Sequence, residues 1–370
     1  MRRVVVCLVA VLSVLAGTAP VASAPPPRAG KPPAAAPVFK VGAASRSVLP
    51  LVDGARGYLD DPALPGLDDA DSPGVFVEQW DAGRVAVGNG HPDAHWVRDD
   101  LRVRAVAVEE LRGSRGGKDI VVMAATDLYM IFRADADVIR ERALAQLPAS
   151  DRDRVHIAIG STHNHHGPDT AFDVNHVWYD QMMDEVAAAI VEAVTNRRPA
   201  ILSVAAGELA FGMRDSRDPQ IIDPTMNVLQ ATATNGDVIA TVVQWNNHPE
   251  VTLGWTPTED RTADCAVLGE AEPCTRNRYF TADFAGHMSR TIEDAVGGVA
   301  PIFVGALGGL VTPLRAAIWE VTDEVGLGNQ FDPPPGAEPA GNETSFTDPN
   351  FRRAVVLGEV GARYALDLLE

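Results

Sequence analysis

The stretch RVHIAIGSTHNHHGPDT (residues 154–170) joins a predicted strand directly to a loop with three histidines. Val155, Ile157 and Ile159 recur at every second position, which is the period of a strand with one buried face. The chain has nine histidines, so this one loop holds a third of them. The spacing alone leaves two interpretations open: a site that binds a metal or transfers protons, and a polar surface turn.

Similar apolar alternation or short apolar runs predict further strands along the chain. These strands are expected at 101–110, 119–127, 200–209, 238–248 and 300–309. Helical spacing and good helix formers predict helices at 177–196, 282–298 and 348–370. Strands and helices mixed along one chain predict an α/β or mixed α+β fold, with large mixed sheets flanked by helices. Segment 320–350, rich in Pro, Gly and acidic residues, is expected to be a loop or lid.

The N-terminus has the three-part layout of a secretory signal: two arginines, a short apolar run and small residues before position 24. We expect a signal peptide at 1–24, a disordered Pro/Ala-rich leader at 25–37 and a single catalytic domain at 38–370. No later segment is apolar enough to span a membrane, so the mature chain is expected to be secreted without a transmembrane segment. In an exported protein, Cys265 and Cys274 are expected to form a disulfide.

The formal net charge of −19 argues against nucleic acid as a partner, because phosphate binding needs a basic face. It leaves a small-molecule or lipid substrate as the expected partner.

Four polar residues stand just after four different predicted strands: Asp127, His163, His248 and Thr312. Loops converge at such strand ends over a rigid scaffold, so sites assemble there. Two or three neutral imidazoles with a carboxylate and one open position form the usual catalytic zinc arrangement. We therefore predict His163 and His248 as metal ligands. His165 is predicted as a proton carrier or substrate contact.

The segment GALGGLVTP (305–313) forms a glycine-rich turn after the last of these strands. Backbone N–H groups at Gly308 and Gly309 could stabilise an oxyanion beside Thr312. Close packing of the turn is the alternative interpretation, because the segment has neither a GxSxG elbow nor a phosphate-binding lysine.

Taken together, these motifs resemble the N-terminal catalytic domain of the neutral/alkaline, non-lysosomal ceramidase family. The stretches that carry the resemblance, in the order that the family has them, are VGAASRSVLP (41–50), GY (57–58), LRVRAVAV (101–108), ATD (125–127), STHNHHGPD (161–169), WNNHPE (245–250), FTADFAGHMSRTIE (280–293) and GALGGLVTP (305–313).

The resemblance implies that His163 and His248 are zinc ligands and that His165 lines the reaction centre. Thr312 falls where the family has its catalytic serine. The family uses zinc to hydrolyse the N-acyl amide of ceramide. It has HTHSG where this chain reads HNHHG, and GDVSP where this chain reads GLVTP.

The family's other zinc ligands, a Glu and a Tyr, lie further downstream than this chain extends. We therefore expect either a C-terminally truncated domain or a shorter relative that completes its site otherwise. Asp127 and Asp283 are the local candidates for the missing metal ligands.

These observations predict a secreted zinc-dependent hydrolase that cleaves a ceramide-like N-acyl amide or a related ester. Two alternatives stay open. One is a non-catalytic secreted protein that keeps the scaffold and binds a metal or ligand. The other is a phosphoesterase with two metal ions bridged by Asp127 or Asp283.

Overall fold

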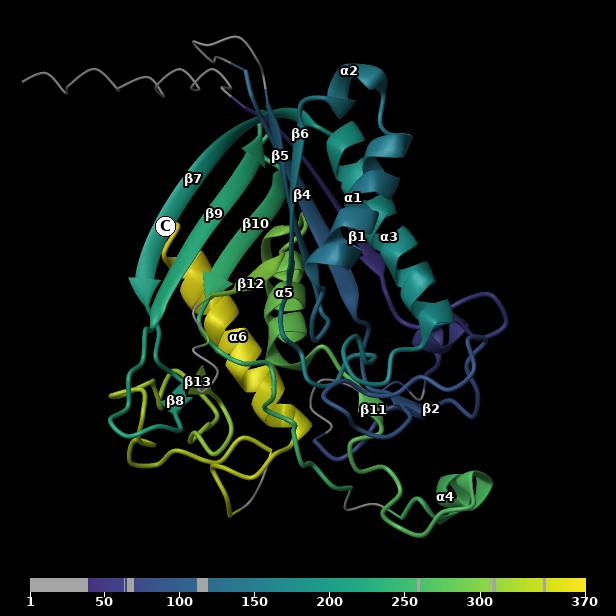
Figure 1. The fold of residues 1–370 in the computed structure, drawn as a ribbon. Helices are drawn as coiled ribbons and strands as arrows, with labels where there is room; N and C mark the ends of the chain where they lie inside the picture. Colours follow the sequence, from purple (N-terminus) through teal and green to yellow (C-terminus); the bar gives the residue numbers. More distant parts are fainter. Residues whose placement is uncertain are drawn as a thin grey trace, which may run out of the picture. The chain divides into compact units, whose positions relative to one another are not determined.

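Eight strands form one mixed β-sheet at the centre of the protein (Figure 1). In spatial order they are β12 (Ile302–Val304), β10 (Val238–Trp245), β9 (Thr225–Ala233), β7 (Arg198–Glu208), β1 (Phe39–Ser47), β4 (Arg102–Glu110), β5 (Ile120–Thr126) and β6 (Val155–Ser161). The pairs β5–β6 and β10–β12 are parallel, and the other neighbours are antiparallel. The predicted fold class, a large mixed sheet flanked by helices, is confirmed.

This computed structural model describes residues 39–62, 64, 70–111, 119–257, 260–305, 307, 311–341 and 344–370. The predicted signal peptide (1–24) and leader (25–37) lie outside the described residues. Gly308 and Gly309 lie outside them as well, so the expected oxyanion turn stays a prediction.

The sheet consists of two halves that meet over a short overlap and then curl towards each other. Strands β1 and β7 pair only through Phe39–Val41. The outermost strands, β6 and β12, nevertheless come into contact: a Cβ added to Gly160 would lie 3.3 Å from the Phe303 ring. The missing side chain at Gly160 therefore leaves room for Phe303. This contact brings the C-terminal ends of β6, β10 and β12 to the same region.

Two pairs of helices cover the sheet (Figure 1). Helix α3 (His176–Thr195) packs against β1, β4 and β5, and α1 (Arg133–Gln146) packs on α3 and contacts β6. Gly42 allows the close approach of α3, because a Cβ there would lie 2.2 Å from the Ala193 carbonyl oxygen. Helices α5 (Asp283–Val296) and α6 (Phe351–Asp367) pack on each other and share a core with Val228 and Trp245 of the other half.

Short elements build the remainder of the described chain. They are η1 (Gly57–Asp60), β2 (Val75–Phe76), β3 (Trp96–Val97), α2 (Ala149–Arg152), β8 (Arg214–Asp215), α4 (Thr262–Leu268), β11 (Tyr279–Phe280) and β13 (Val311–Thr312). The predicted helices correspond to α3, α5 and α6, and the described residues of 320–350 contain no helix or strand, as expected. Strands β1 and β9 and helix α1 were not predicted. Helix α1 is rich in charged residues and buries only Ala136, Ile139 and Ala143, so its apolar face is narrow.

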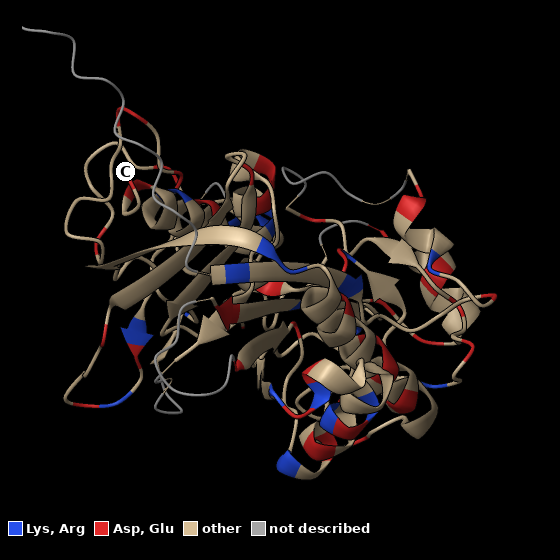
Figure 2. Ribbon diagram, turned by 90° about the horizontal axis from the view of Figure 1, so that it is seen from above, with Lys and Arg blue, Asp and Glu red and all other residues tan. Residues whose placement is uncertain are grey.

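Helix α1 carries both acidic and basic residues, whereas α3 carries Asp and Glu but no Lys or Arg (Figure 2). Arg142 of α1 bonds Asp180 and Asp184 of α3 at 2.5 and 2.8 Å, which ties the two helices together at their exposed side. No described helix has the length and apolar character needed to cross a bilayer.

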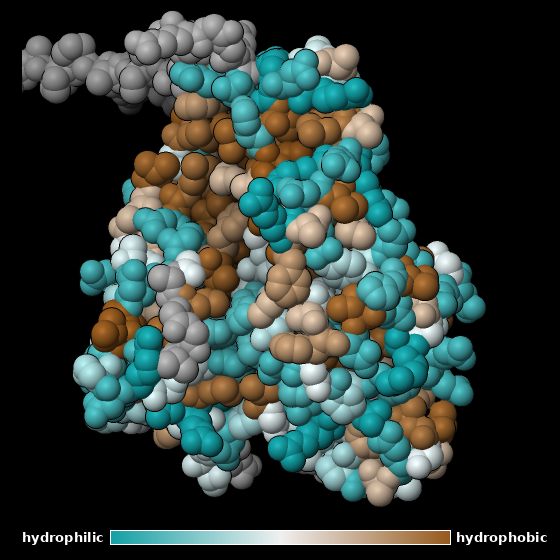
Figure 3. Space-filling view, viewed as in Figure 1, coloured by the Kyte–Doolittle hydropathy of each residue, from teal (hydrophilic) through white to brown (hydrophobic). Residues whose placement is uncertain are grey.

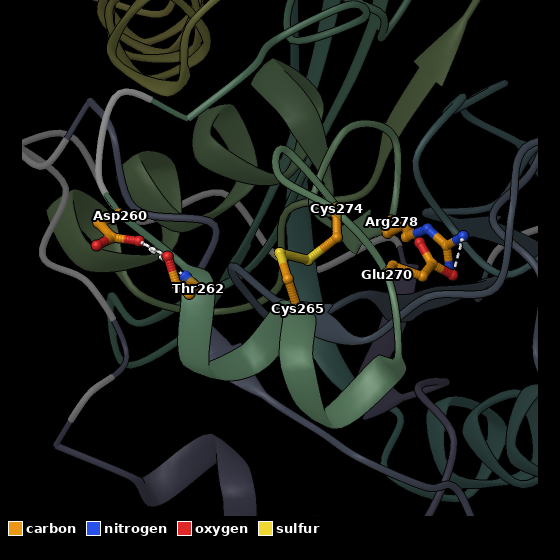
Figure 4. Close-up of a disulfide and its surroundings, with 6 residues drawn as sticks. All are labelled: Asp260, Thr262, Cys265, Glu270, Cys274 and Arg278. Carbon is orange, nitrogen blue, oxygen red and sulfur yellow. Dashed lines mark hydrogen bonds and ion pairs between the residues drawn. A yellow bond between two sulfur atoms is a disulfide. The ribbon is translucent and has the colours of Figure 1, made fainter.

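The predicted disulfide between Cys265 and Cys274 is present and closes the loop that follows α4 (Figure 4). Both cysteines are buried in an aromatic cluster that includes Trp255 and Tyr279. An ion pair of 2.8 Å between Glu270 and Arg278 holds the other side of the loop.

Removal of this disulfide is expected to destabilise the protein by roughly 2–3 kcal/mol, because the cross-link restricts a loop of this length in the unfolded chain. The double substitution Cys265→Ala/Cys274→Ala keeps the site apolar and isolates this effect. Urea unfolding measures it, and reduction of the wild-type protein should reproduce the same loss. Equal midpoints for the oxidised, reduced and substituted proteins would contradict the expectation.

Candidate metal centre

Three histidines from two distant segments converge where the sheet curls on itself. His163 and His165 follow β6, and His248 follows β10. One ring nitrogen from each lies within 4.8 Å of those from the other two. The ring centroids of His163 and His248 are 5.0 Å apart, and those of His165 and His248 are 5.7 Å apart. Residues separated by more than eighty positions in the chain thus form one cluster.

Backbone carbonyls orient two of these rings. His163 Nδ1 lies 3.1 Å from the Tyr129 carbonyl oxygen, and His248 Nδ1 contacts the Val311 carbonyl oxygen. A carbonyl only accepts hydrogen bonds, so each Nδ1 must carry the proton and donate it. The Nε2 atom of each ring is then left with its lone pair, which is the form that binds a metal.

The backbone of His163 is itself unusual, with a φ of +64°. A non-glycine residue in this left-handed region carries strain, which the surrounding structure must offset. Here the Tyr129 ring stacks on the His163 ring at a centroid distance of 4.5 Å and an angle of 24°. The stacking and the Nδ1 hydrogen bond together hold the ring towards the cluster.

His165 is buried, and neither of its ring nitrogens has a hydrogen-bond partner among the described residues. Burial, together with the neighbouring His163 and His248 rings, lowers the pKa of His165 to about 2. The pKa of His163 is lowered for the same two reasons: burial and the nearby His248 ring. These imidazoles are therefore neutral at physiological pH and offer lone pairs to a cation.

The cluster fits a divalent transition metal. Three imidazole nitrogens are a known ligand set for zinc, which also accepts water or substrate in its fourth position. Unpartnered buried nitrogens such as those of His165 are costly in the free protein, and a metal ion would satisfy one nitrogen of this ring.

The two aspartates expected to complete the ligand set lie elsewhere. Asp127 is buried and accepts hydrogen bonds of 3.0 Å from Arg104 and from the Arg102 backbone N–H. Asp283 accepts from Thr252 and from the Phe284 backbone N–H. Neither carboxylate belongs to the histidine cluster that the described residues form. As predicted, Asp127 directly follows a strand, β5, and Asp283 stands at the start of a helix, α5. Their carboxylate oxygens, however, accept hydrogen bonds from neighbouring protein groups.

Thr312 does reach the site, through a residue that the sequence interpretation missed. Its hydroxyl donates a hydrogen bond to Glu250 Oε1. The other carboxylate oxygen, Oε2, lies 3.6 Å from His165 Nδ1. Glu250 stands two residues after His248 in WNNHPE, so a carboxylate near a candidate ligand was the signal that could have identified it.

No protein-family model and no curated protein sequence matches this chain. Two solved structures do match its fold. A ceramidase complexed with C2 superposes with a TM-score of 0.56 at 17% sequence identity, covering 90% of this chain and 44% of that structure. The neutral ceramidase from Pseudomonas aeruginosa superposes with a TM-score of 0.54 at 18% identity, covering 90% and 45% respectively.

The fold is ceramidase-like. The chain spans less than half the length of either ceramidase structure. The resemblance found in the sequence motifs is therefore matched at the level of the fold, with the histidine cluster at the ends of its strands.

Proposed function

We propose that this protein is a secreted, zinc-dependent hydrolase that cleaves a ceramide-like N-acyl amide or a related ester. The observation that carries the proposal is the convergence of His163, His165 and His248 at the strand ends of a ceramidase-like fold. When bound, zinc polarises a carbonyl group and activates water near neutral pH. In this chain the three imidazoles would hold the ion, and the carbonyls of Tyr129 and Val311 orient two of them.

An apolar substrate group is supported by the aromatic surroundings of the cluster. Phe172 is 66% exposed, and its ring lies 6.1 Å from that of Tyr129, which stacks on His163. An exposed phenylalanine beside a polar site offers a surface to an acyl chain. Apolar side chains also gather in the upper half of Figure 3. Val121 of β5 and Val204 of β7 are among the exposed apolar residues of the sheet.

Export is supported by two features of the chain. The predicted signal peptide would direct secretion, and the Cys265–Cys274 disulfide is typical of oxidising compartments. We therefore propose that the protein acts outside the cell or in a comparable oxidising compartment.

Removal of the metal is expected to abolish hydrolysis, and added Zn²⁺ is expected to restore it. The test uses the purified protein with fluorescent short-chain N-acyl sphingosine and with a nitrophenyl acyl ester, before and after treatment with a chelator. Bound zinc without turnover of either substrate would instead favour a binding protein. Hydrolysis of a phosphate ester with two metals per chain would favour a phosphoesterase.

A further inference from the structure

We propose that Glu250 and Thr312 form a second layer around the metal centre, in which Glu250 orients His165 as a third metal ligand. The inference rests on the metal centre of the proposed function and adds the residues that support it. Compared with the roles expected from the sequence, His165 is a ligand instead of a proton carrier, and Thr312 is a positioning residue instead of a group that acts on the substrate.

The first argument is the common arrangement of the three rings. His163 and His248 each direct Nδ1 towards an acceptor, the carbonyl of Tyr129 or Val311. His165 repeats this pattern with a carboxylate, because its Nδ1 faces Glu250 Oε2 at 3.6 Å. This separation exceeds a hydrogen bond by about 0.5 Å, which a small side-chain movement would close. With Nδ1 assigned to Glu250, the unpartnered Nε2 of His165 is free for the shared cation.

The second argument is that Glu250 is fixed in this position. Its side chain is buried, and Thr312 donates a hydrogen bond to Oε1. Thr312 lies in β13, which pairs with β8, and its hydroxyl also accepts a hydrogen bond of 3.0 Å from the Leu314 N–H. The carboxylate is therefore held through Oε1, and its second oxygen, Oε2, faces the His165 ring.

The third argument is that the backbone joins the two loops. The His165 N–H donates to the Pro249 carbonyl at 3.2 Å, and the Glu250 N–H donates to the His248 carbonyl at 2.9 Å. His165, His248 and Glu250 are thus connected through main-chain bonds as well as side chains. A carboxylate–histidine–metal arrangement fixes the ring and raises the basicity of the ligand.

This arrangement would give the ion a full set of protein ligands from the described residues. Three imidazole nitrogens would bind the ion, and the Glu250 carboxylate would orient one of these rings without binding the ion itself. The hydroxyl of Thr312 is engaged by Glu250, so Thr312 acts by positioning that carboxylate. Neither Asp127 nor Asp283 is required.

Metal affinity tests the proposal without any measurement of turnover. Competition with a chromophoric chelator gives the affinity for Zn²⁺, and the visible spectrum of the Co²⁺-loaded protein reports the ligand field. Glu250→Ala is expected to weaken binding about 10- to 100-fold, as for other residues that orient metal ligands. Glu250→Gln keeps an acceptor and should lose less. Glu208→Ala, at an exposed glutamate at the end of β7, is the control and should bind as the wild type does.

Thr312 provides a second pair of variants in case Glu250→Ala folds poorly. Thr312→Val removes the hydroxyl at nearly constant volume and is expected to weaken binding several-fold. Thr312→Ser keeps the hydroxyl and should bind normally. Circular dichroism and thermal unfolding establish that each variant is folded.

A double-substitution cycle tests whether Thr312 acts through Glu250 in a protein that keeps all three imidazoles. If it does, Thr312→Val should cause no further loss of Zn²⁺ affinity in a Glu250→Ala background. An equal loss in both backgrounds, or normal affinity and an unchanged Co²⁺ spectrum in Glu250→Ala, would overturn the inference while leaving the proposed metal centre intact. A wild-type protein that binds neither Zn²⁺ nor Co²⁺ would overturn both.

Discussion

His248→Ala is expected to abolish stoichiometric zinc binding, from about one ion per chain to none after dialysis. His248 is the only ligand of the cluster that comes from the second half of the sheet, so its loss leaves two neighbouring histidines on one loop. Two imidazoles without the third cannot enclose a tetrahedral ion with one open position. Hydrolysis should fall to the background rate in parallel.

Elemental analysis of the purified His248→Ala variant measures its zinc content. His163→Ala removes a different ligand and should lose zinc in the same way. His156→Ala is the matched control, because the His156 side chain is 64% exposed on β6 and its ring lies 3.6 Å from Asp119, away from the cluster. It should retain full zinc. If His248→Ala kept one zinc per chain while folded, the three-histidine centre would be wrong.

Arg104→Ala is expected to destabilise the protein by about 3–5 kcal/mol, the cost of leaving a buried charge without its partner. The guanidinium is almost completely buried and bonds Asp127 at 3.0 Å and Glu293 of α5 at 2.8 Å. It therefore joins β4, the end of β5 and α5. Burial raises the pKa of Asp127, and Arg104 opposes this shift, so the pair is strongly interdependent.

Urea unfolding measures the loss. Arg142→Ala is the control, because its partners Asp180 and Asp184 are exposed and such pairs contribute at most about 1 kcal/mol. Asp127→Asn tests whether Asp127 is a metal ligand, under conditions where the variant is folded. The variant should keep its zinc, because the Asp127 carboxylate bonds Arg104 and not the ion. Loss of zinc from a folded Asp127→Asn protein would restore Asp127 as the metal ligand that its position after β5 suggests.

Local patterns predicted much of this fold. The alternation in 101–110 and 154–163 gave β4 and β6 nearly to the residue, and the glycines at 297–298 marked the end of α5. The apolar pattern did not predict a strand where polar residues interrupt it. Strand β9 reads TMNVLQATA, in which Asn227 and Gln230 interrupt the apolar positions because one face of this strand is partly exposed.

For the site, too, local signals were predicted from the sequence and long-range contacts were not. His163 and His248 were predicted as ligands because each follows a strand, which is a local signal, and the structure places both in one cluster. Asp127 gave the same signal, yet its carboxylate bonds Arg104, which the pairing of β4 with β5 places beside it. Glu250 was missed because its partners, His165 and Thr312, are distant in the chain.

The sequence alone determined many of the longer strands and helices, the disulfide partners and the histidines that stand at strand ends, since all of these follow from short-range period and residue type. Only the tertiary structure determined which of those strand ends meet. The close contact of Gly160 with Phe303 curls the outermost strands together and so brings His163 and His165 to His248. That curl arises from packing between residues far apart in the chain, and no local pattern encodes it.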